Sequence, residues 1–321
     1  MQFALPPRQL STSHPPYIPS TRLSLLRRRQ LKAIAVFGLA LLTIFYLLSY
    51  FSFSRDSPAD VTPAGTPNVV IVTLFDREGL SDSHIQMITK NREYYAMKHG
   101  YTNFFANTSD YLYAFGSDIP YSWALIPAVR HAMATHPYST YFFHLNPHAL
   151  IMNPDISVTS HVLDRKRIES LMLKDIPVVP PDSVIKTFSH VKGNDVEFIL
   201  SQDKEDLTSD NFFIKQGDWA HFLLDAWFDP LYRSYGFAKA EKHALDHIVQ
   251  WHPTILTKMA LFPQRVFNAY SKDSPGAVVN GTYQDGDFII RFSRCQTYDN
   301  RDCEQEMQPF YKSWQKSHRQ N

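Results

Sequence analysis

The sequence predicts an α/β domain, with a mostly parallel sheet between two layers of helices, behind a single N-terminal transmembrane helix. Two observations carry this prediction. Between residues 69 and 145, β-branched strand patterns alternate with helical patterns, and this alternation is typical of parallel sheets. Ahead of them, residues 33–53 form a run of 21 residues without a charged side chain, and about 20 apolar residues in a helix span a bilayer.

The charges around this apolar run predict its orientation. Residues 1–32 contain six basic side chains and no acidic one, whereas only Arg55 follows closely, beside Asp56 and Asp60. Because basic flanks stay on the cytoplasmic side, we expect a cytoplasmic tail at 1–32, a signal anchor at 33–53 and a luminal C-terminal part. A cleaved signal peptide is the alternative, and the long basic leader and the lack of a small-residue cleavage pattern weaken it.

The luminal part divides into a stem and one folded domain. Residues 54–68 are rich in Pro, Ser, Asp and Ala, which is typical of a linker, and the domain follows at 69–321. Its first half predicts strands and helices in alternation: strand 69–74, helix 83–99 ended by Gly100, strand 101–106, helix 122–135 and strand 141–145. Its second half predicts strands at 196–201, 211–215 and 288–292, and helices at 219–227, 238–250 and 304–314.

A polar break follows the strand at 141–145. In open sheets of this type, ligands bind beyond the carboxyl ends of the strands. The break, Asn146-Pro147-His148, is therefore a candidate binding site. The formal net charge is +1 without a long block of one sign, which argues against a dedicated nucleic-acid-binding protein.

Cysteine usage and sequons agree with a luminal location. Cys295 and Cys303 are close in sequence and could form a local disulfide in an oxidising compartment. Two free thiols remain the alternative, because spacing alone does not establish disulfide geometry. Asn107 and Asn280 each begin an Asn-x-Ser/Thr sequon and are candidates for N-glycosylation.

Several stretches in series carry a family resemblance. They are NREYYAMKHGY (91–101), WALIPAVRHAM (123–133), ALIMNP (149–154), FLLDAWFDPLY (222–232), AEKHALDHIVQWHP (240–253), LFPQRVFNAYS (261–271) and DGDFIIRFSRC…RDCEQEMQPFY (285–311). Together they resemble glycosyltransferase family 34, which includes fungal α-galactosyl- and α-mannosyltransferases. The nearest branch is that of the Golgi α-1,6-mannosyltransferase subunits that extend N-glycan mannan. The resemblance implies the GT-A nucleotide-sugar fold and transfer with retention of the anomeric configuration.

The chain departs from this family at the metal motif. The family carries an Asp-x-Asp motif that holds Mn²⁺ against the donor diphosphate, and the matching positions here are Asn146 and His148. A His that also serves the metal in the family is replaced by Arg291. Divalent Mn²⁺ and Mg²⁺ prefer anionic oxygen ligands. We therefore expect no metal at these degenerate positions, although Mn²⁺ is typical of the family.

The same departures bring positive charge to the expected donor site. Arg294 replaces a Gly of the family and Lys242 replaces a Gln, so these two side chains and Arg291 are candidates to bind diphosphate oxygens, together with Asn146 and His148. Glu241 keeps an acidic residue of the family and is the candidate catalytic residue.

Three residues are candidates for the acceptor region: Asp203, Trp251 and His252. Each also has a structural interpretation. Asp203 could instead cap a turn, which is the commoner use of such an Asp, and the Trp251-His252-Pro253 stretch could be the end of a packed helix.

Three functions are compatible with the sequence. The first is a Golgi type II hexosyltransferase that transfers mannose from GDP-mannose, or galactose from UDP-galactose, to N-glycan outer chains within a mannosyltransferase complex. The second is a catalytically inactive scaffold subunit of that complex, because the metal motif is degenerate. The third and weakest is a lectin-like module. A nucleotide sugar, a glycan acceptor and other Golgi mannosyltransferase subunits are the partners implied.

Overall fold

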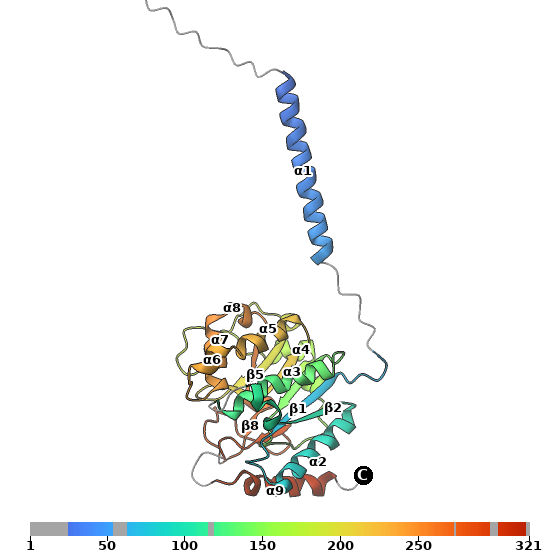
Figure 1. Ribbon diagram of the computed structural model, residues 1–321. Coiled ribbons are helices and arrows are strands. Elements are labelled where there is room, and N and C mark those ends of the chain that lie inside the picture. The colour runs from blue at the N-terminus through green and yellow to red at the C-terminus, as the bar shows by residue number, and fades with distance from the viewer. Residues whose placement is uncertain (1–24, 54–62, 115–118, 273, 296–300, 319–321) are drawn as a thin grey trace, which may run out of the picture. The chain divides into compact units, whose positions relative to one another are not determined.

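The computed structural model describes residues 25–53, 63–114, 119–272, 274–295 and 301–318 (Figure 1). The chain divides into two compact units, Met1–Val61 and Thr62–Asn321. The first contains helix α1 (Leu25–Phe53), in which Gln30–Leu47 is long and apolar enough to cross a membrane. This helix is compatible with the predicted anchor. Residues 1–24 of the predicted tail and 54–62 of the predicted stem lie outside the described residues.

The second unit is built on a six-stranded sheet with the order β2-β1-β3-β6-β5-β7. Its strands are β1 (Val69–Phe75), β2 (Thr102–Asn107), β3 (Tyr141–Leu145), β5 (Phe198–Gln202), β6 (Leu207–Lys215) and β7 (Met259–Phe262). Strand β1 is parallel to β2 and β3, and β5 is parallel to β7, whereas β6 is antiparallel to both of its neighbours. The sheet is thus mostly parallel, with one reversed strand in its centre.

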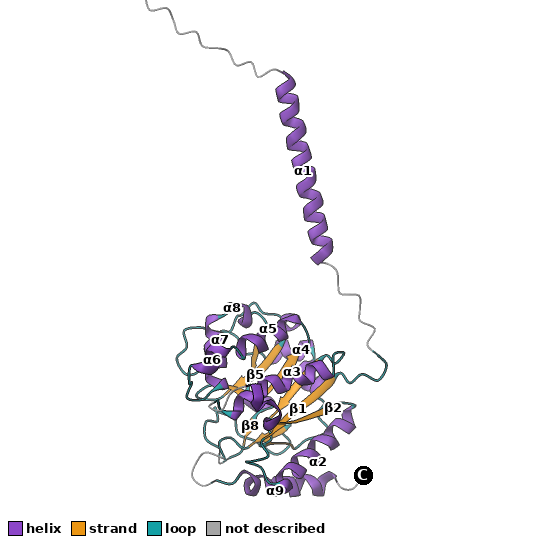
Figure 2. Cartoon of the chain, viewed as in Figure 1, coloured by secondary structure: helices purple, strands orange, loops and turns teal. Residues whose placement is uncertain are grey.

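Helices cover both faces of this sheet, as predicted (Figure 2). Successive side chains of a strand point to opposite faces. Val70 and Val72 of β1 accordingly join a hydrophobic cluster with α3, α5 and α7, while Val69 and Ile71 join another with α2 and α4. The helices are α2 (Asp82–His99), α3 (Leu125–Thr135), α4 (Arg165–Leu171), α5 (Asp218–Trp227), α6 (Pro230–Ser234), α7 (Glu241–Trp251), α8 (Pro253–Leu256) and α9 (Cys303–His318).

A second, three-stranded sheet has the order β4-β9-β8. Its strands are β4 (Ala149–Ile151), β8 (Ala269–Tyr270) and β9 (Ile289–Arg291). Side chains of β4 and β9 pack with α2 and α9 in a third hydrophobic cluster. Short turns of 3₁₀ helix at Thr108–Ala114, Tyr121–Ala124, Gly193–Asp195 and Gln264–Val266, and a π-helical turn at Thr159–Leu163, complete the described elements.

The predicted strands and helices are all found, with shifted ends. Gly100 ends α2 in the left-handed conformation, with φ 67°, as expected for a C-terminal glycine. Helix α7 begins at Glu241 rather than at residue 238, because Ala240 has φ 46°, a value outside the helical region that is uncommon for a residue with a side chain. The sequence reading missed β4, β7 and β8, which are only two to four residues long.

Candidate functional site

A cleft of about 670 Å³ opens where β3 ends and α7 begins. This volume lies within the usual range for small-molecule pockets. The residues that line it come from the β3 tip, β6, the segment before α3, the start of α7 and the chain after β9: His144, Asn146, Pro147, His148, Ser209, Asp210, Pro120, Tyr121, Ser122, Leu125, Phe237, Ala238, Lys239, Ala240, Glu241, Lys242 and Arg294, with Leu74, Asp76, Leu80, Thr108 and Glu205. The cleft therefore lies at the strand end that the sequence predicted.

A buried arginine holds the polar turn after β3. The Arg92 guanidinium of α2 is fully buried and donates to the carbonyl oxygens of Asn146, at 3.0 Å, and Ala149, at 2.8 Å. The Asn146 side-chain oxygen accepts the backbone N–H of His148 at 2.8 Å. Burial lowers the pKa of Arg92 to about 9. The turn is thus fixed both from within and from the helix behind it.

Asp210 joins three of the predicted donor-site residues. Leu145 of β3 pairs with Asn211 of β6, so Asp210 lies beside the turn and accepts the Asn146 side-chain N–H at 3.0 Å. It also contacts Lys242 Nζ at 2.6 Å and Arg291 Nη2 at 2.5 Å. Burial alone would raise the pKa of Asp210, but Arg291 and Lys242 hold it below its usual range. The carboxylate is therefore ionised and pairs with both cations, which leaves this group of three side chains with a net charge of one positive unit.

The network continues behind the cleft through Tyr270. Arg291 donates from Nη1 to the Tyr270 hydroxyl at 2.9 Å, and that hydroxyl donates to Asp203 Oδ2 at 3.0 Å. The other Asp203 oxygen accepts the backbone N–H groups of Glu205 and Asp206, at 2.8 and 3.0 Å. Asp203 thus caps a turn, which is the structural alternative that the sequence left open, and it does not line the cleft.

A second group of ion pairs lies at the cleft wall. Arg294 donates to both oxygens of Glu205, at 3.1 and 2.6 Å, the bidentate geometry that suits a carboxylate. Lys239 bonds Glu205 at 2.9 Å and also pairs with Asp206. Hydrogen bonds from Arg294 and then Lys239 lower the pKa of Glu205 to about 2. Each of the three cations that line the cleft, Lys239, Lys242 and Arg294, is consequently beside a carboxylate.

Three cleft-lining side chains bury polar atoms without a hydrogen-bond partner in the described part of the chain. They are Glu241 Oε2, His144 Nδ1 and Ser209 Oγ, on residues that are 5%, 4% and 1% exposed. Burial lowers the pKa of His144 to about 4, which favours the neutral imidazole, and it raises the pKa of the Glu241 carboxyl. Buried polar groups are nearly always hydrogen-bonded, so these three atoms are among the exceptions in the described part of the chain.

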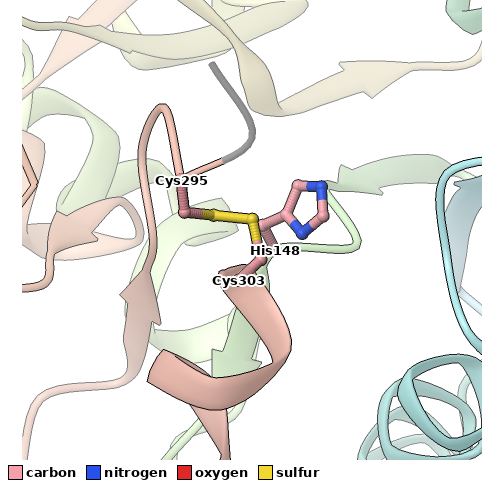
Figure 3. Close-up of side chains that lie close together, drawn as sticks. All are labelled: His148, Cys295 and Cys303. Atoms are coloured by element: carbon pink, nitrogen blue, oxygen red, sulfur yellow. A yellow bond between two sulfur atoms is a disulfide. The ribbon is translucent and has the colours of Figure 1, made fainter. Parts of the chain in front are cut away.

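The residues at the predicted metal position do not fit a divalent cation. The Asn146 side-chain oxygen accepts from the backbone of its own turn, and the Asp210 oxygens contact Asn146, Lys242 and Arg291. Among the described residues, His148 also lies close to Cys295 and Cys303 (Figure 3). Those two cysteines form a disulfide, and a disulfide lacks the thiolate that ligates metals.

A further group of ligand types lies on α7 and the turn before β6. Atoms of Asp206, His243 and Asp246 are within 4.8 Å of one another. Asp206 is already paired with Lys239, and Asp246 accepts the backbone N–H of Leu207 at 3.1 Å. Burial raises the pKa of Asp246 to about 7. These partners make the group part of the structural network around the turn.

The structure brings together most, but not all, of the predicted site residues. Asn146, His148, Glu241, Lys242 and Arg294 line the cleft. Arg291 was expected to face the donor phosphates. It lies behind Asp210 instead, is 5% exposed and is absent from the cleft lining, because a buried guanidinium needs a carboxylate partner.

The predicted acceptor residues lie apart from the cleft lining. Trp251 is 70% exposed at the last position of α7, and His252 follows it as the C-cap. From the sequence, no binding role was predicted for Arg92, His144, Ser209 or Asp210. The signal available for Asp210 was a charged residue within the apolar strand pattern of β6.

The two predicted glycosylation sites differ in environment. Asn107 is half-buried, and its side-chain oxygen accepts from Arg77 Nε at 2.7 Å. Asn280 is exposed in a turn, with φ 63°. Asn280 is therefore the more accessible of the two in the folded domain.

Comparisons with known proteins show what the chain is similar to. The model of the galactosyl transferase GMA12/MNN10 family matches residues 65–303. A relative named uncharacterized alpha-1,2-galactosyltransferase, from Schizosaccharomyces pombe, is 31% identical over 252 residues, which are 76% of this chain and 75% of the relative. The probable alpha-1,6-mannosyltransferase MNN11 of Saccharomyces cerevisiae is 31% identical over 268 residues, 78% of this chain and 63% of that protein.

A solved structure shares the fold. It is that of a glycosyltransferase involved in the glycosylation of the major capsid of PBCV-1, with a TM-score of 0.51 and 11% identity, over 76% of this chain and all of the other. At this identity the likeness concerns the fold alone. Together with the mixed α/β sheet, it confirms the predicted GT-A class.

Proposed function

Because the chain belongs to the galactosyl transferase GMA12/MNN10 family, glycosyltransferase family 34, we propose that it transfers mannose from GDP-mannose to N-glycan outer chains. In this proposal it is a single-pass type II protein of the Golgi membrane, anchored by α1, and works with other mannosyltransferase subunits. Its relatives carry both mannosyl- and galactosyltransferase names. UDP-galactose is therefore the alternative donor.

The observation that carries the proposal is the cleft at the end of β3, whose wall combines polar side chains with cations. His144, Ser209 and Glu241 line the cleft, and the hydroxyl groups of a hexose can each donate and accept hydrogen bonds. Burial lowers the pKa of His144 to about 4, and a neutral imidazole suits a sugar hydroxyl better than a second cation does. We assign this part of the cleft to the transferred sugar.

The cations of the cleft would stabilise the leaving diphosphate. In the transfer, the bond between sugar C1 and the diphosphate oxygen breaks, C1 forms a new bond to an acceptor hydroxyl oxygen, and the proton of that hydroxyl passes to the departing diphosphate. Negative charge then develops on the diphosphate. Lys242 and Arg294 line the cleft beside Asp210 and Glu205, and can exchange these carboxylates for phosphate oxygens. No step requires a metal ion.

A scaffold role is the second candidate, and one observation favours it. Each cleft cation is already paired with a carboxylate, and the Asn146 turn is closed by its own hydrogen bond. A cleft in that state attracts a diphosphate less than one with uncompensated positive charge. In this case the fold would serve to bind an active transferase subunit.

Nucleotide-sugar binding separates the two candidates. Residues 62–321 carry the whole central sheet and all three hydrophobic clusters, so this fragment is suitable for calorimetry with GDP-mannose and UDP-galactose. An active enzyme should bind GDP-mannose equally with Mn²⁺ and with a chelator. Loss of binding on chelation would refute the metal-independent site, and no binding of either donor would favour the scaffold.

The ion pairs decide which cation can be replaced to test donor binding. Arg291→Ala is unsuitable, because it would leave the buried Asp210 without its closest cation. Arg294→Ala removes a cation from the cleft wall, where its side chain is 20% exposed, and should weaken donor binding. Arg265→Ala, which breaks an ion pair with Asp287 outside the cleft lining, is the matched control and should leave donor binding unchanged.

A further inference from the structure

Five aromatic side chains form a continuous cluster on α6, α7 and the segment between them. His247 contacts the rings of Tyr232, Phe237 and Trp251 at centroid distances of 5.5, 6.1 and 6.0 Å. Tyr235 contacts Tyr232 at 5.9 Å and Phe237 at 5.5 Å. Because His247 and Trp251 are four residues apart on α7, they lie on the same face of that helix. We call this set the aromatic cluster.

The cluster is exposed at one end and reaches the cleft at the other. Trp251 is 70% exposed and Tyr235 is 53% exposed. Phe237 is half-buried and lines the cleft. A contiguous exposed apolar patch generally marks a binding surface. Two ring contacts, Trp251–His247 and His247–Phe237, connect the exposed end of the cluster to the rim of the candidate donor site.

The composition of the cluster suits a carbohydrate. One face of a pyranose ring presents C–H groups that carry slight positive charge, and these pack against the negative face of an aromatic ring. Tyr, Trp and His rings combine such a face with a polar edge that can hydrogen-bond sugar hydroxyls. The rings of the hydrophobic core differ, since Trp123 and Trp227 are 1% and 0% exposed.

We propose that the aromatic cluster binds the part of an acceptor oligosaccharide that lies outside the cleft. The proposal rests on the proposed transferase function, because an acceptor whose reacting end enters the cleft must leave across its rim, and Phe237 belongs to that rim. Contact with Tyr235 and Trp251 would select extended mannose chains over single sugars. Trp251 thereby keeps a role in acceptor binding although it lies outside the cleft.

Glycan binding to fragment 62–321 tests the inference. Calorimetry would compare linear α-linked mannohexaose with free mannose, for the parent and for Trp251→Ala/Tyr235→Ala. We expect the double variant to bind the hexasaccharide about tenfold more weakly or worse, with GDP-mannose affinity unchanged. Trp251→Phe should retain most of the affinity, because a stacking face remains. Tyr138→Ala, which truncates an aromatic side chain that is 48% exposed outside the cluster, is the control and should behave as the parent.

The outcomes separate this inference from the proposed function. Hexasaccharide affinity that is the same in the parent and the double variant, or equally reduced by Tyr138→Ala, would overturn the glycan platform. Absence of hexasaccharide binding in the parent, with GDP-mannose still bound, would also overturn it while leaving the donor site in place. A double variant that binds the hexasaccharide normally but no longer associates with a mannosyltransferase subunit would identify the cluster as a protein interface instead.

Discussion

The buried carboxylate of Asp210 should be one of the most sensitive positions for stability. Asp210 is 9% exposed and lies 2.5 Å from Arg291, which is 5% exposed. Asp210→Asn keeps the shape of the side chain but leaves the Arg291 charge buried without its carboxylate. Breaking a buried pair from one side costs about 3–5 kcal/mol of unfolding free energy. The Tyr270 hydroxyl, which accepts from Arg291 at 2.9 Å, should place the loss near the lower end.

Urea unfolding of fragment 62–321 measures this loss. Trp123, Trp219, Trp227, Trp251 and Trp314 all lie in the fragment and report unfolding by fluorescence, with the free energy from linear extrapolation. The double variant Asp210→Asn/Arg291→Met removes both charges and should be more stable than Asp210→Asn alone, because two buried charges then need no compensation. Asp155→Asn breaks the exposed pair with Lys98 and is the control, with little change expected.

Two results would refute this reasoning. A loss below about 1 kcal/mol for Asp210→Asn would place the Asp210–Arg291 pair in the range of surface ion pairs. Strictly additive losses for Asp210→Asn and Arg291→Met would mean that the two side chains do not interact energetically. Either result would remove the basis for treating Arg291 as the structural partner of Asp210 rather than as a donor ligand.

Three further changes should have measurable effects. Burial raises the pKa of Asp246 from 3.8 to about 7. Between these two pH values the native state therefore holds a proton that the unfolded state has released. The free energy of unfolding should consequently fall by up to about 4 kcal/mol as the pH rises from about 4 to above 7. Urea titrations at pH 5 and pH 8 should show this difference in unfolding free energy for the parent and lose it in Asp246→Asn. If the difference is the same in the variant, another group causes it. Arg92→Leu leaves the carbonyls of Asn146 and Ala149 without their hydrogen-bond donor and should lower the free energy of unfolding by about 2 kcal/mol or more. An unchanged free energy of unfolding would show that the turn is stable without Arg92. Cys295→Ser/Cys303→Ser opens a short loop and should cost about 2–3 kcal/mol; dithiothreitol should lower the urea midpoint of the parent but not that of the variant.

Local sequence patterns were enough to predict the strands and helices that position the site. The strand pattern at 69–74, the helix that Gly100 ends and the strand at 141–145 are present in the structure nearly as predicted. Each depends on burial periodicity or on the conformational preference of one residue, and both are readable over a few neighbours. The position of the cleft at the β3 end followed from the general geometry of such sheets.

Short and reversed strands could not be predicted in the same way. Strands β4, β7 and β8 are too short to show a period. The direction of β6 depends on its partners β3 and β5, and no residue within β6 encodes it. That direction nevertheless sets the site, because the antiparallel register places Asp210 beside Asn146.

By itself, the sequence determined the family, the apolar N-terminal segment, the alternating frame and the polar turn with Asn146 and His148 after the third strand. Only the tertiary structure decided how the substituted charges are used. Arg291 and Lys242 both contact Asp210, a residue distant from each of them in the chain, and Arg291 thereby lies behind the cleft rather than in it. The physical reason is that periodicity reports which residues are buried, whereas the compensation of a buried charge depends on strand register and helix packing across the whole fold.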